Sequence, residues 1–458
     1  MKNLNLINPF TGEKLASFPV QPLEDVQKDV HRLHQTQRKW AKLSLKERVH
    51  AVENAITYFE THRDQIARDI SEEMGRPLHQ CQGEVNGFFE RARYMISIAE
   101  TTLASDIIED SDEFFREIQH VPLGVVFVIS AWNYPLLITV NSVIPALIAG
   151  NTILLKHSSR TPLIGQHFEQ AFSQMLSLGP FVKNIVVDHA TTGEIIEKLA
   201  IDHVVFTGSV KGGHEILRHT SKKFLQPQLE LGGKDAAYVH RDADIRRAAE
   251  SVVDGTCYNS GQSCCGIERV YVHKDVYEEF KSYCLELMKS YRLGDPSSPE
   301  TQLGPMAQKS AVDEALNQVQ EALAQGAKVL CGGDGYTIKE GHFLKPTLLE
   351  NVHSQMSVMQ EENFSPVLPL QKVENESQAL DFINDSDYGL TTAIFTSDRN
   401  FAKNFAADIE SGTVFMNRCD YLDPALPWTG VKNSGVGSSL SKYGYYGLTR
   451  RKSIHFRK

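Results

Sequence analysis

An alternation of short β-rich runs with helical stretches, between residues 124 and 207, is the sequence feature that most constrains the fold. The β-rich runs are 124–130, 152–156, 184–188 and 203–207, and helical spacing of apolar residues fills the gaps at 140–149, 163–178 and 193–200. Strands that alternate with helices predict right-handed crossovers and a parallel, Rossmann-like sheet. Ligands of such sheets bind beyond the carboxyl ends of the strands.

The flanking regions extend this α/β pattern. The first third of the chain predicts helices over 23–43, 45–74 and 83–105, and Gly75-Arg76-Pro77 ends the second of them. A second α/β region predicts strands over 236–240, 269–273, 329–330 and 393–395, and helices over 244–258, 276–291 and 311–325. Two segments differ: 107–121 predicts an exposed strand or hairpin, and 451–458 predicts an extra strand donated to a partner.

Length and charge limit the class of protein. A chain of 458 residues suggests about three domains. A net charge of −10 argues against nucleic acid or an anionic membrane as the main partner. The N-terminal segment has no apolar signal-peptide core, so the expected compartment is the cytoplasm.

The stretch from Val121 to Leu155 carries no charged side chain and is long enough to suggest a membrane span. Prolines, glycines and asparagines interrupt it, however. Short apolar runs between such residues are typical of buried parallel strands and a core helix. We therefore interpret this stretch as the interior of the predicted sheet.

The seven cysteines show neither zinc-site spacing nor a disulfide framework, so free thiols and no metal site are expected. Cys264 has a distinctive setting, Asn259-Ser-Gly-Gln-Ser-Cys264-Cys265. Gly261 and Gln262 predict a turn that presents a thiol at the mouth of a cleft, where a stabilised thiolate acts as a nucleophile. A small buried core residue is the simpler interpretation of an isolated cysteine. That interpretation is kept for Cys81, Cys257, Cys284, Cys331 and Cys419.

Three further motifs have both a functional and a structural interpretation. In Glu230-Leu-Gly-Gly-Lys234, a carboxylate precedes two glycines that allow a close approach of backbone. Asn133, in Trp132-Asn133-Tyr134-Pro135, is an amide at a strand end that either stabilises an oxyanion or caps a helix. The glycine turn from Phe206 to Gly213 suits phosphate binding at a helix N-terminus but lacks the full dinucleotide pattern.

Taken together, these motifs resemble the aldehyde dehydrogenase superfamily over nearly the whole chain. The resemblance begins at Asn8-Pro-Phe-Thr-Gly12 and includes WNYP, AGNTILLK, FTGS, ELGGK and GQSC. It continues through Glu361-Glu362-Asn-Phe364 and Tyr388-Gly-Leu to Gly430-Val-Lys-Asn-Ser-Gly435. The motifs occur in the order and at the spacing of that family.

The resemblance implies a catalytic set of three residues. Cys264 falls on the nucleophile, Glu230 on the base that activates the hydrolytic water, and Asn133 on the side-chain donor of the oxyanion hole. The implied reaction oxidises an aldehyde to a carboxylic acid through a thioester on Cys264. Splitting the reaction at a covalent intermediate replaces one high barrier with two lower ones.

The resemblance also implies a cofactor, NAD or NADP. The implied cofactor-binding residues are Trp132, Lys156, Ser159, Gly208, Ser209, Gly213, Glu362 and Phe364. Many NAD-preferring members have a glutamate where this chain has Ser159, and that glutamate would repel a 2′-phosphate. With Arg160 adjacent, the sequence predicts that NADP is tolerated or preferred.

The substrate side is predicted from the segment after Asn417 and from the WNYP motif. We expect Trp132, Tyr134, Arg418 and Leu422 to line a tunnel for a small-molecule aldehyde. Arg418 would meet the carboxylate of a semialdehyde such as succinic semialdehyde. The simpler interpretation is a surface arginine paired with Asp420.

Several alternatives stay open at this point. A coenzyme A-acylating enzyme is disfavoured by Glu230, because thiol transfer needs no water-activating base. A non-catalytic structural or binding protein would be expected to lack one of the three catalytic residues. A disulfide between Cys264 and Cys265 under oxidation is a hypothesis that rests on adjacency alone.

The resemblance predicts an architecture in three parts. The expected cofactor domain covers 1–105 and 122–232, the α/β catalytic domain covers 233–432, and a β oligomerisation element covers 106–121 and 433–458. A homodimer or homotetramer is expected, because partners usually cover edge strands of this kind.

Overall fold

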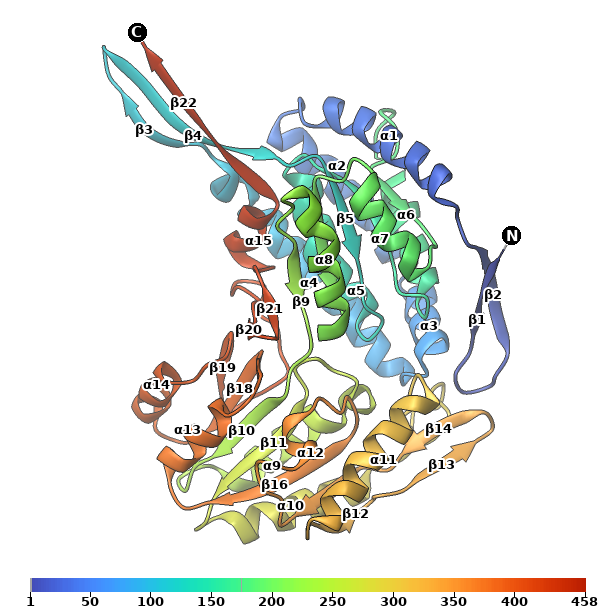
Figure 1. Cartoon of the computed structure of the whole chain (residues 1–458), viewed down its shortest axis with the longest axis vertical. Coiled ribbons are helices and arrows are strands. Elements are labelled where there is room, and N and C mark those ends of the chain that lie inside the picture. The colour runs from blue at the N-terminus through green and yellow to red at the C-terminus, as the bar shows by residue number, and fades with distance from the viewer. Residues whose placement is uncertain (1, 174) are drawn as a thin grey trace.

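The computed structural model describes residues 2–173 and 175–458 and contains two large sheets, one above the other in Figure 1. The upper sheet has the strand order β21-β9-β8-β5-β6-β7, and all its pairs are parallel except β21 with β9. Its strands are β5 (Val125–Ile129), β6 (Thr152–Lys156), β7 (Val182–Asn184), β8 (His203–Thr207), β9 (Gln228–Glu230) and β21 (Gly435–Val436). The parallel sheet predicted from the alternating pattern is confirmed.

Helices cover both faces of the upper sheet, which explains why its central strands are apolar throughout. Val126 and Val128 of β5 pack in one core with α2, α4 and α5, and Val125 and Phe127 face a second core with α1 and α7. The helices are α1 (Leu23–Trp40), α2 (Leu45–Thr61), α3 (Arg63–Met74), α4 (Leu78–Leu103), α5 (Pro135–Ile148), α6 (Pro162–Ser173), α7 (His189–Lys198), α8 (Val210–Thr220) and α15 (Ser441–Gly447). Residue 174 of the helix predicted over 163–178 lies outside the described residues.

The lower sheet has the order β12-β15-β16-β11-β10-β18-β19 and is parallel except for β12 with β15. Its strands are β10 (Asp235–Val239), β11 (Ile267–His273), β12 (Lys328–Cys331), β15 (Thr347–Glu350), β16 (Val367–Val373), β18 (Thr391–Phe395) and β19 (Thr413–Met416). The core on one face contains α9 (Ile245–Cys257) and α10 (Tyr277–Ser290). The other contains α11 (Lys309–Ala324), α12 (Ser357–Gln360), α13 (Glu376–Asn384) and α14 (Arg399–Ala407).

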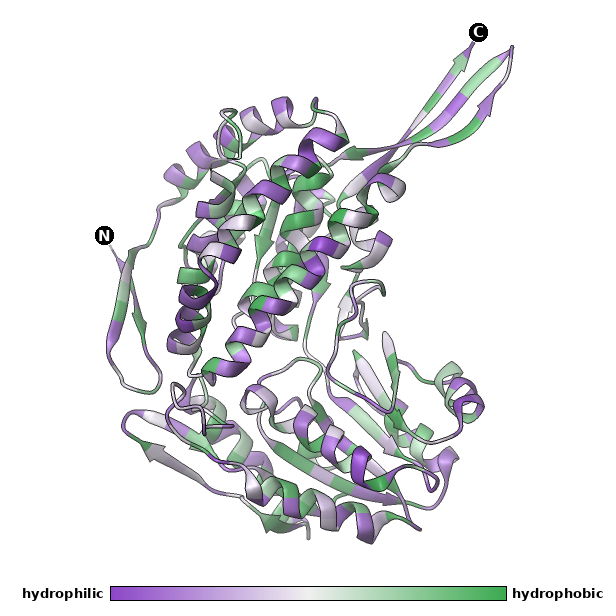
Figure 2. Ribbon diagram, turned by 180° about the vertical axis from the view of Figure 1, so that it is seen from behind, coloured by the Kyte–Doolittle hydropathy of each residue, from purple (hydrophilic) through white to green (hydrophobic). Residues whose placement is uncertain are grey.

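A three-stranded arm projects from the upper half of the molecule (Figure 1). It consists of β3 (Asp106–Asp110), β4 (Phe114–Pro122) and β22 (Thr449–Arg457), in the order β22-β4-β3. Figure 2 shows hydrophobic and hydrophilic residues alternating along its strands, as expected for a sheet with two different faces. Small hairpins and pairs complete the fold: β1 (Asn3–Ile7) with β2 (Lys14–Pro19), β13 (Gly335–Ile338) with β14 (Gly341–Leu344), and β17 (Tyr388–Gly389) with β20 (Val431–Lys432).

Two local predictions need correction. The helix predicted over 45–74 is broken at His62, whose ring nitrogen Nδ1 contacts the Tyr58 carbonyl at 2.8 Å and whose backbone leaves helical geometry. The strand predicted over 184–188 lies earlier, because Val182–Asn184 pairs with β6. The tail over 451–458 forms a strand that pairs along its length with β4 of the same chain, and its donation to a partner stays a prediction.

The uncharged stretch from Val121 to Leu155 forms the end of β4, the strand β5, the helix α5 and most of β6. Of the helices in the described part of the chain, none combines the length and the apolar character that crossing a membrane would require.

Candidate active site

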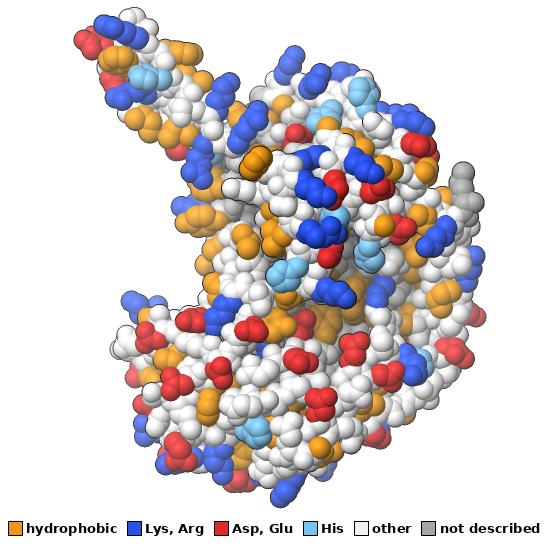
Figure 3. Space-filling view, in the orientation of Figure 1, with side chains coloured by type: hydrophobic (Ala, Val, Ile, Leu, Met, Phe, Trp, Pro, Cys, Tyr) orange, Lys and Arg blue, Asp and Glu red, His pale blue; other side chains and the backbone are white. Residues whose placement is uncertain are grey.

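Four of the predicted motifs meet at one edge of the upper sheet. Asn133 follows β5, Lys156 ends β6, Gly208 follows β8 and Glu230 ends β9. These strands are parallel neighbours, so their carboxyl ends lie side by side where such sheets bind ligands. Figure 3 shows a hollow along the boundary between the two halves, with lysine and arginine side chains above it and acidic side chains below.

The nucleophile motif forms a tight turn between α9 and β11. Three successive residues have left-handed backbone, with φ of 52° at Asn259, 56° at Ser260 and 75° at Gly261. A Cβ atom at Gly261 would lie 2.2 Å from the carbonyl carbon of Ser365. Glycine is therefore required here both by conformation and by space. The turn places Cys264 half-buried at its end.

Hydrogen bonds fix this turn and join it to the Asn133 loop. The side-chain amide of Asn259 donates to the Asn133 carbonyl at 3.1 Å and to the Gln262 carbonyl at 3.0 Å. Gln262 donates back to the Asn259 carbonyl at 3.0 Å and accepts from the Ala307 backbone at 3.0 Å. These buried contacts give the turn one conformation, which orients the Cys264 backbone and side chain.

The two glycines of the ELGGK motif lie where other segments approach closely. A Cβ atom at Gly232 would lie 2.4 Å from the Glu362 carboxylate, and one at Gly233 would lie 2.7 Å from the Cys264 carbonyl oxygen. The close approach of backbone predicted from these glycines is confirmed. It brings the Glu362 loop and the Cys264 turn next to the chain segment that carries Glu230.

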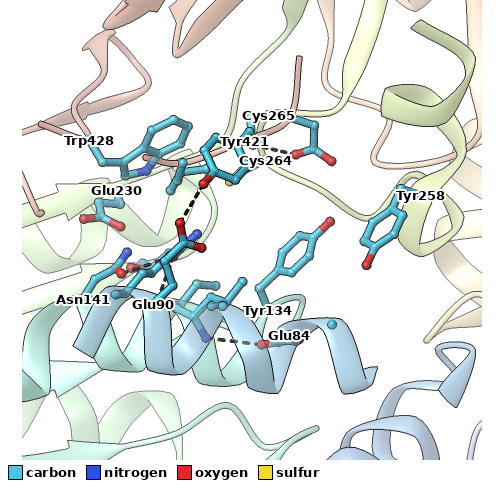
Figure 4. A pocket seen from close by; sticks show the side chains of 18 of the residues that line it. Glu84, Glu90, Tyr134, Asn141, Glu230, Tyr258, Cys264, Cys265, Tyr421 and Trp428 are labelled. Atoms are coloured by element: carbon cyan, nitrogen blue, oxygen red, sulfur yellow. Dashed lines mark hydrogen bonds between the residues drawn. The ribbon is translucent and has the colours of Figure 1, made fainter. Parts of the chain in front are cut away.

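Cys264 and Glu230 line one cavity of about 410 Å³, together with the predicted substrate residues Tyr134 and Leu422 (Figure 4). Glu230 is buried, and the Gln228 amide donates to its Oε1 at 3.2 Å. Burial raises the pKa of the Glu230 carboxyl, because the charged form loses hydration. A buried carboxyl group and a half-buried thiol that share a cavity are suited to covalent and acid–base chemistry.

Asn133 is buried and is not among the residues that line this cavity. Its carbonyl accepts the bond from Asn259, while its side-chain amide makes no hydrogen bond to any described residue. The amide therefore keeps its donors for another partner.

The predicted substrate side needs two corrections. Trp132 does not line the cavity; its ring packs edge-on against Phe364 at 5.8 Å and lies beneath the Arg160 guanidinium at 5.0 Å. Arg418 is also outside the cavity and is exposed, with its guanidinium 3.8 Å from the centre of the Tyr421 ring. Arg418 is not paired with Asp420 either, because that carboxylate binds Ser263 and Cys265.

A second cavity of about 200 Å³ lies at the carboxyl ends of β6 and β7 and is lined by Lys156 and Ser159. Lys156 is buried, and loss of hydration lowers the pKa of its ammonium group. Its ammonium group donates no hydrogen bond within the described chain, so it is available to a ligand with hydroxyl or anionic oxygens. Lys2 also lines this cavity, whereas Arg160 does not, because it stacks on Trp132.

The remaining predicted cofactor residues flank the two cavities. Ser209 caps α8, with its hydroxyl accepting from the Gly212 backbone at 3.2 Å, and Gly208 leaves the N-terminus of this helix accessible. Gly213 packs on Leu231, which a Cβ atom would approach to 2.7 Å. The N-terminal turn of α8 thus lies next to Glu230, in the position that favours an anionic group.

The loop with Glu362 and Phe364 is hydrogen-bonded through its backbone to Glu268. This buried carboxylate pairs with Lys234 at 2.7 Å and accepts from the backbone of Asn363 and Phe364 at 2.9 Å each. Glu362 accepts from the Gly233 backbone at 3.3 Å. Burial and the nearby Glu268 charge raise the pKa of Glu362 to about 8.

Several lining residues were missed by the sequence analysis. They come from one face of α4, the segment before α4, the start of the nucleophile turn and the segment between β19 and β20; they are Arg76, Glu84, Glu90, Arg91, Tyr258, Asp420, Tyr421 and Trp428. The signal in α4 was weak: Glu84 and Arg91, two turns apart, are charged residues that are buried in a helix. Periodicity alone does not say which face of a helix borders a cavity.

All seven cysteines are free thiols, as expected. The Cys265 thiol donates to Asp420 at 2.9 Å, and the neighbouring Cys264 thiol together with burial raises the pKa of Cys265. Cys265 is therefore directed at Asp420 in the reduced protein. The disulfide with Cys264 stays a hypothesis.

Comparison with known proteins agrees with this geometry. Residues 1–454 match the model of the aldehyde dehydrogenase family. An aldehyde dehydrogenase of Paenarthrobacter nicotinovorans is 34% identical over 98% of each chain. A succinate-semialdehyde dehydrogenase [NADP(+)] of Deinococcus radiodurans is 32% identical over 98% of this chain and 94% of its own.

One similar solved structure is that of succinic semialdehyde dehydrogenase from Streptococcus pyogenes in complex with NADP+. It is 30% identical in sequence, has a TM-score of 0.95, and the match covers 99% of this chain and 100% of that chain. The fold class predicted from the sequence is thereby confirmed. The protein described here belongs to the aldehyde dehydrogenase family.

Proposed function

We propose that this protein oxidises an aldehyde to the carboxylic acid, with Cys264 as nucleophile and Glu230 as general base. The observation that carries the proposal is that the half-buried Cys264 thiol and the buried Glu230 carboxyl line one cavity of about 410 Å³. The relatives, which are named as aldehyde dehydrogenases, support the reaction class.

In the first half of the proposed mechanism, the Cys264 thiolate adds to the aldehyde carbon. The carbonyl oxygen becomes an oxyanion, and in this proposal the Asn133 side-chain amide and the Cys264 backbone N–H donate to it. Removal of one such donor typically costs on the order of 100-fold or more in rate. Loss of hydride from this adduct leaves a thioester on Cys264.

In the second half, Glu230 takes a proton from a water molecule that attacks the thioester carbon. The C–S bond breaks, Cys264 leaves as a thiolate, and the carboxylic acid departs. A carboxyl group with a raised pKa is a stronger base than an ordinary glutamate, and this suits the step.

The residues present fit NAD or NADP, which supplies the hydride acceptor when bound. Lys156 is a buried ammonium group without a hydrogen-bond partner among the described residues, and Ser159 at the same cavity carries no charge. Asp188 is the carboxylate that lines this cavity, and its charge is opposed by Lys156 and Lys2. Gly208 and Ser209 would hold a diphosphate at the start of α8, and Glu362 and Phe364 would flank the nicotinamide end. Lys2, not Arg160, supplies the second positive charge at the Lys156 cavity, and this supports use of NADP.

Two alternatives make different predictions. A coenzyme A-acylating enzyme would need added coenzyme A for acyl release, and a structural protein on this fold would give no turnover. Glu230 lines the same cavity as the Cys264 thiol, and this favours hydrolysis of the thioester over the acylating and the structural alternative. The semialdehyde expectation loses its support from Arg418, which lies outside the cavity.

Absorbance of the reduced cofactor, measured with NAD and NADP separately over a panel of aldehydes, tests the proposal. Turnover should vanish in Cys264→Ala. It should persist in Cys331→Ala, which removes an equally half-buried thiol in β12, outside the cavity. Activity that survives in Cys264→Ala would refute the assignment of the nucleophile, and acid formation that requires coenzyme A would favour the acylating alternative.

A further inference from the structure

The charges that line the catalytic cavity are unbalanced. Arg76 and Glu84 form a buried ion pair, which cancels both. Arg91 makes no ion pair within the described chain and donates to the Leu137 carbonyl and the Asn141 amide, at 3.1 Å each. Its charge attracts the Glu230 carboxylate, which lines the same cavity. These four groups together contribute no net charge when Glu230 is ionised.

Three further carboxyl groups line the cavity without a cation partner among the described residues. Glu90 and Asp254 are exposed towards solvent, and Glu90 accepts a bond from the Tyr421 hydroxyl at 2.8 Å. Asp420 lies deeper, beside the nucleophile turn. Carboxyl groups therefore outnumber guanidinium groups among the residues that line the substrate cavity. Glu90, which is one of the outer carboxyl groups, is labelled in Figure 4.

Asp420 is held in one orientation beside the nucleophile turn. Burial raises the pKa of its carboxyl, and hydrogen bonds from Cys265 and Ser263 oppose that shift by stabilising the carboxylate. Its backbone is in the left-handed region, with φ of 49°, and a single oxygen, Oδ1, accepts from both Ser263 at 3.0 Å and Cys265 at 2.9 Å. Its other oxygen accepts no hydrogen bond from a described residue. The residues on either side of Cys264 thus hold one carboxylate oxygen and leave the second for a ligand.

Aromatic rings that line the cavity make cation–π contacts with arginine side chains of the same chain. The Arg76 guanidinium lies 4.6 Å from the Tyr134 ring centre and 5.3 Å from that of Tyr258. Arg418 lies over the ring of Tyr421. The Tyr134 hydroxyl is buried and has no hydrogen-bond partner in the described chain. Aromatic faces and carboxylates around one cavity are the chemistry that recognises ammonium groups.

We propose that this cavity selects aldehydes that carry a positive charge, with an amine or quaternary ammonium group held by Asp420 and the outer carboxylates while the carbonyl reaches Cys264. This inference rests on the proposed function and names its substrate class. A carboxylate-bearing substrate such as succinic semialdehyde would meet these three carboxyl groups. Both guanidinium groups that line the cavity already face a carboxylate, because Arg76 pairs with Glu84 and Arg91 attracts Glu230.

A matched trio of aldehydes separates charge from shape. The cationic probe carries a trimethylammonium group three methylene groups from the carbonyl, and its neutral isostere carries a tert-butyl group instead. The quaternary group keeps its charge at every pH and cannot cyclise with the aldehyde. Succinic semialdehyde is the anionic probe. We expect kcat/KM for the cationic probe to exceed that of the neutral isostere by about tenfold or more, with the anionic probe lowest.

Asp420→Asn tests the residue that the inference singles out. An asparagine oxygen still accepts from Ser263 and Cys265, so the turn is retained while the charge is lost. The ratio of kcat/KM for the cationic and neutral probes should fall about tenfold. Asp423→Asn is the control, because this exposed neighbour does not line the cavity, and its ratio should equal that of the wild type.

The outcomes separate this inference from the function on which it rests. Equal kcat/KM for the cationic and neutral probes, or a preference for succinic semialdehyde, would overturn the charge selectivity and leave the dehydrogenase proposal in place. Turnover of none of the probes, with no acyl group on Cys264, would contradict the proposed function and this inference with it.

Discussion

Glu230 is a carboxyl group placed where its charged form is poorly hydrated, and this sets the expected pH dependence. A base acts only when deprotonated, so thioester hydrolysis should increase as the pH rises through the pKa of Glu230. Because burial raises that pKa, the increase should lie above the usual glutamate range. At a pH below the pKa of Glu230 the carboxyl is protonated, and the rate of thioester hydrolysis should be low.

The Glu230→Gln variant tests this role. It should still reduce about one equivalent of cofactor in the first turnover and then slow by about 100- to 10,000-fold, because water is no longer activated. Its residual rate should lack the increase with pH that the wild type has. Glu286→Gln, on the exposed face of α10, is the control and should behave as the wild type. Unchanged steady turnover in Glu230→Gln would assign the base to another group.

At the scale of elements, the nucleophile turn depends on Gly261. Gly261→Ala would place a Cβ atom 2.2 Å from the Ser365 backbone at a φ of 75°. Gly326→Ala has a comparable conformational cost, with φ of 102°, but meets nothing within 4 Å. Gly261→Ala should therefore reduce the free energy of unfolding by about 1–2 kcal/mol more than Gly326→Ala does. This difference is the typical cost of overpacking. Urea unfolding of both variants measures the difference, and equal losses would contradict the steric account.

The Glu362 loop depends on the buried pair between Glu268 and Lys234. Glu268→Gln would leave the Lys234 ammonium group buried and uncompensated, and we expect a loss of about 3–5 kcal/mol in unfolding free energy. The exposed pair of Glu374 with Lys274 is the matched comparison, and Glu374→Gln should cost at most about 1 kcal/mol. Comparable effects of the two variants would show that the buried pair does not stabilise the loop region.

Many of the helices and strands could be predicted from the sequence. Fully apolar runs such as 125–129 identify strands buried on both faces, and Gly75 ends α3 with a left-handed φ of 77° as expected. The break at His62 could not be predicted, because neither glycine nor proline marks it. The contacts of its ring are with the carbonyl and the ring of Tyr58, one turn earlier, and the sequence pattern does not reveal them. The pairing of the tail depends on β4, which lies over 300 residues earlier.

The site was predicted unevenly for a related reason. Cys264 and Glu230 belong to short motifs whose glycines reflect local backbone needs, so the sequence points to them directly. Glu90 and Asp420 come from distant elements, and only the packing of α4 against the segment after β19 brings them together. Arg418 was assigned to the substrate side by position in the chain, but its side chain stacks on Tyr421 outside the cavity.

At the scale of the whole molecule, we propose that 1–105 with 122–232 binds the cofactor, that 233–432 carries the nucleophile, and that the arm mediates assembly into a homodimer or homotetramer. The arm exposes Ile107, Ile108 and Phe456, which are 56%, 58% and 60% accessible, on edge strands that one chain alone leaves open. Partners usually cover such edges.

Ile108→Asp should shift the protein to a smaller assembly, because a charge would be buried in the proposed contact. Light scattering coupled to size-exclusion chromatography measures the mass. Phe224→Asp, which changes an exposed apolar residue that does not belong to the arm, is the control and should leave the mass unchanged. A wild-type monomer would contradict the proposed role of the arm.

The covalent thioester on Cys264 is the central claim, and mass spectrometry of Glu230→Gln tests it most directly. After rapid mixing with aldehyde and cofactor and an acid quench, the peptide that contains Cys264 should gain the mass of the acyl group, located on Cys264 and not on Cys265. The same peptide from Cys264→Ala should gain nothing. Cofactor reduction by Glu230→Gln without an acyl peptide, or an acyl group located on Cys265, would contradict the mechanism.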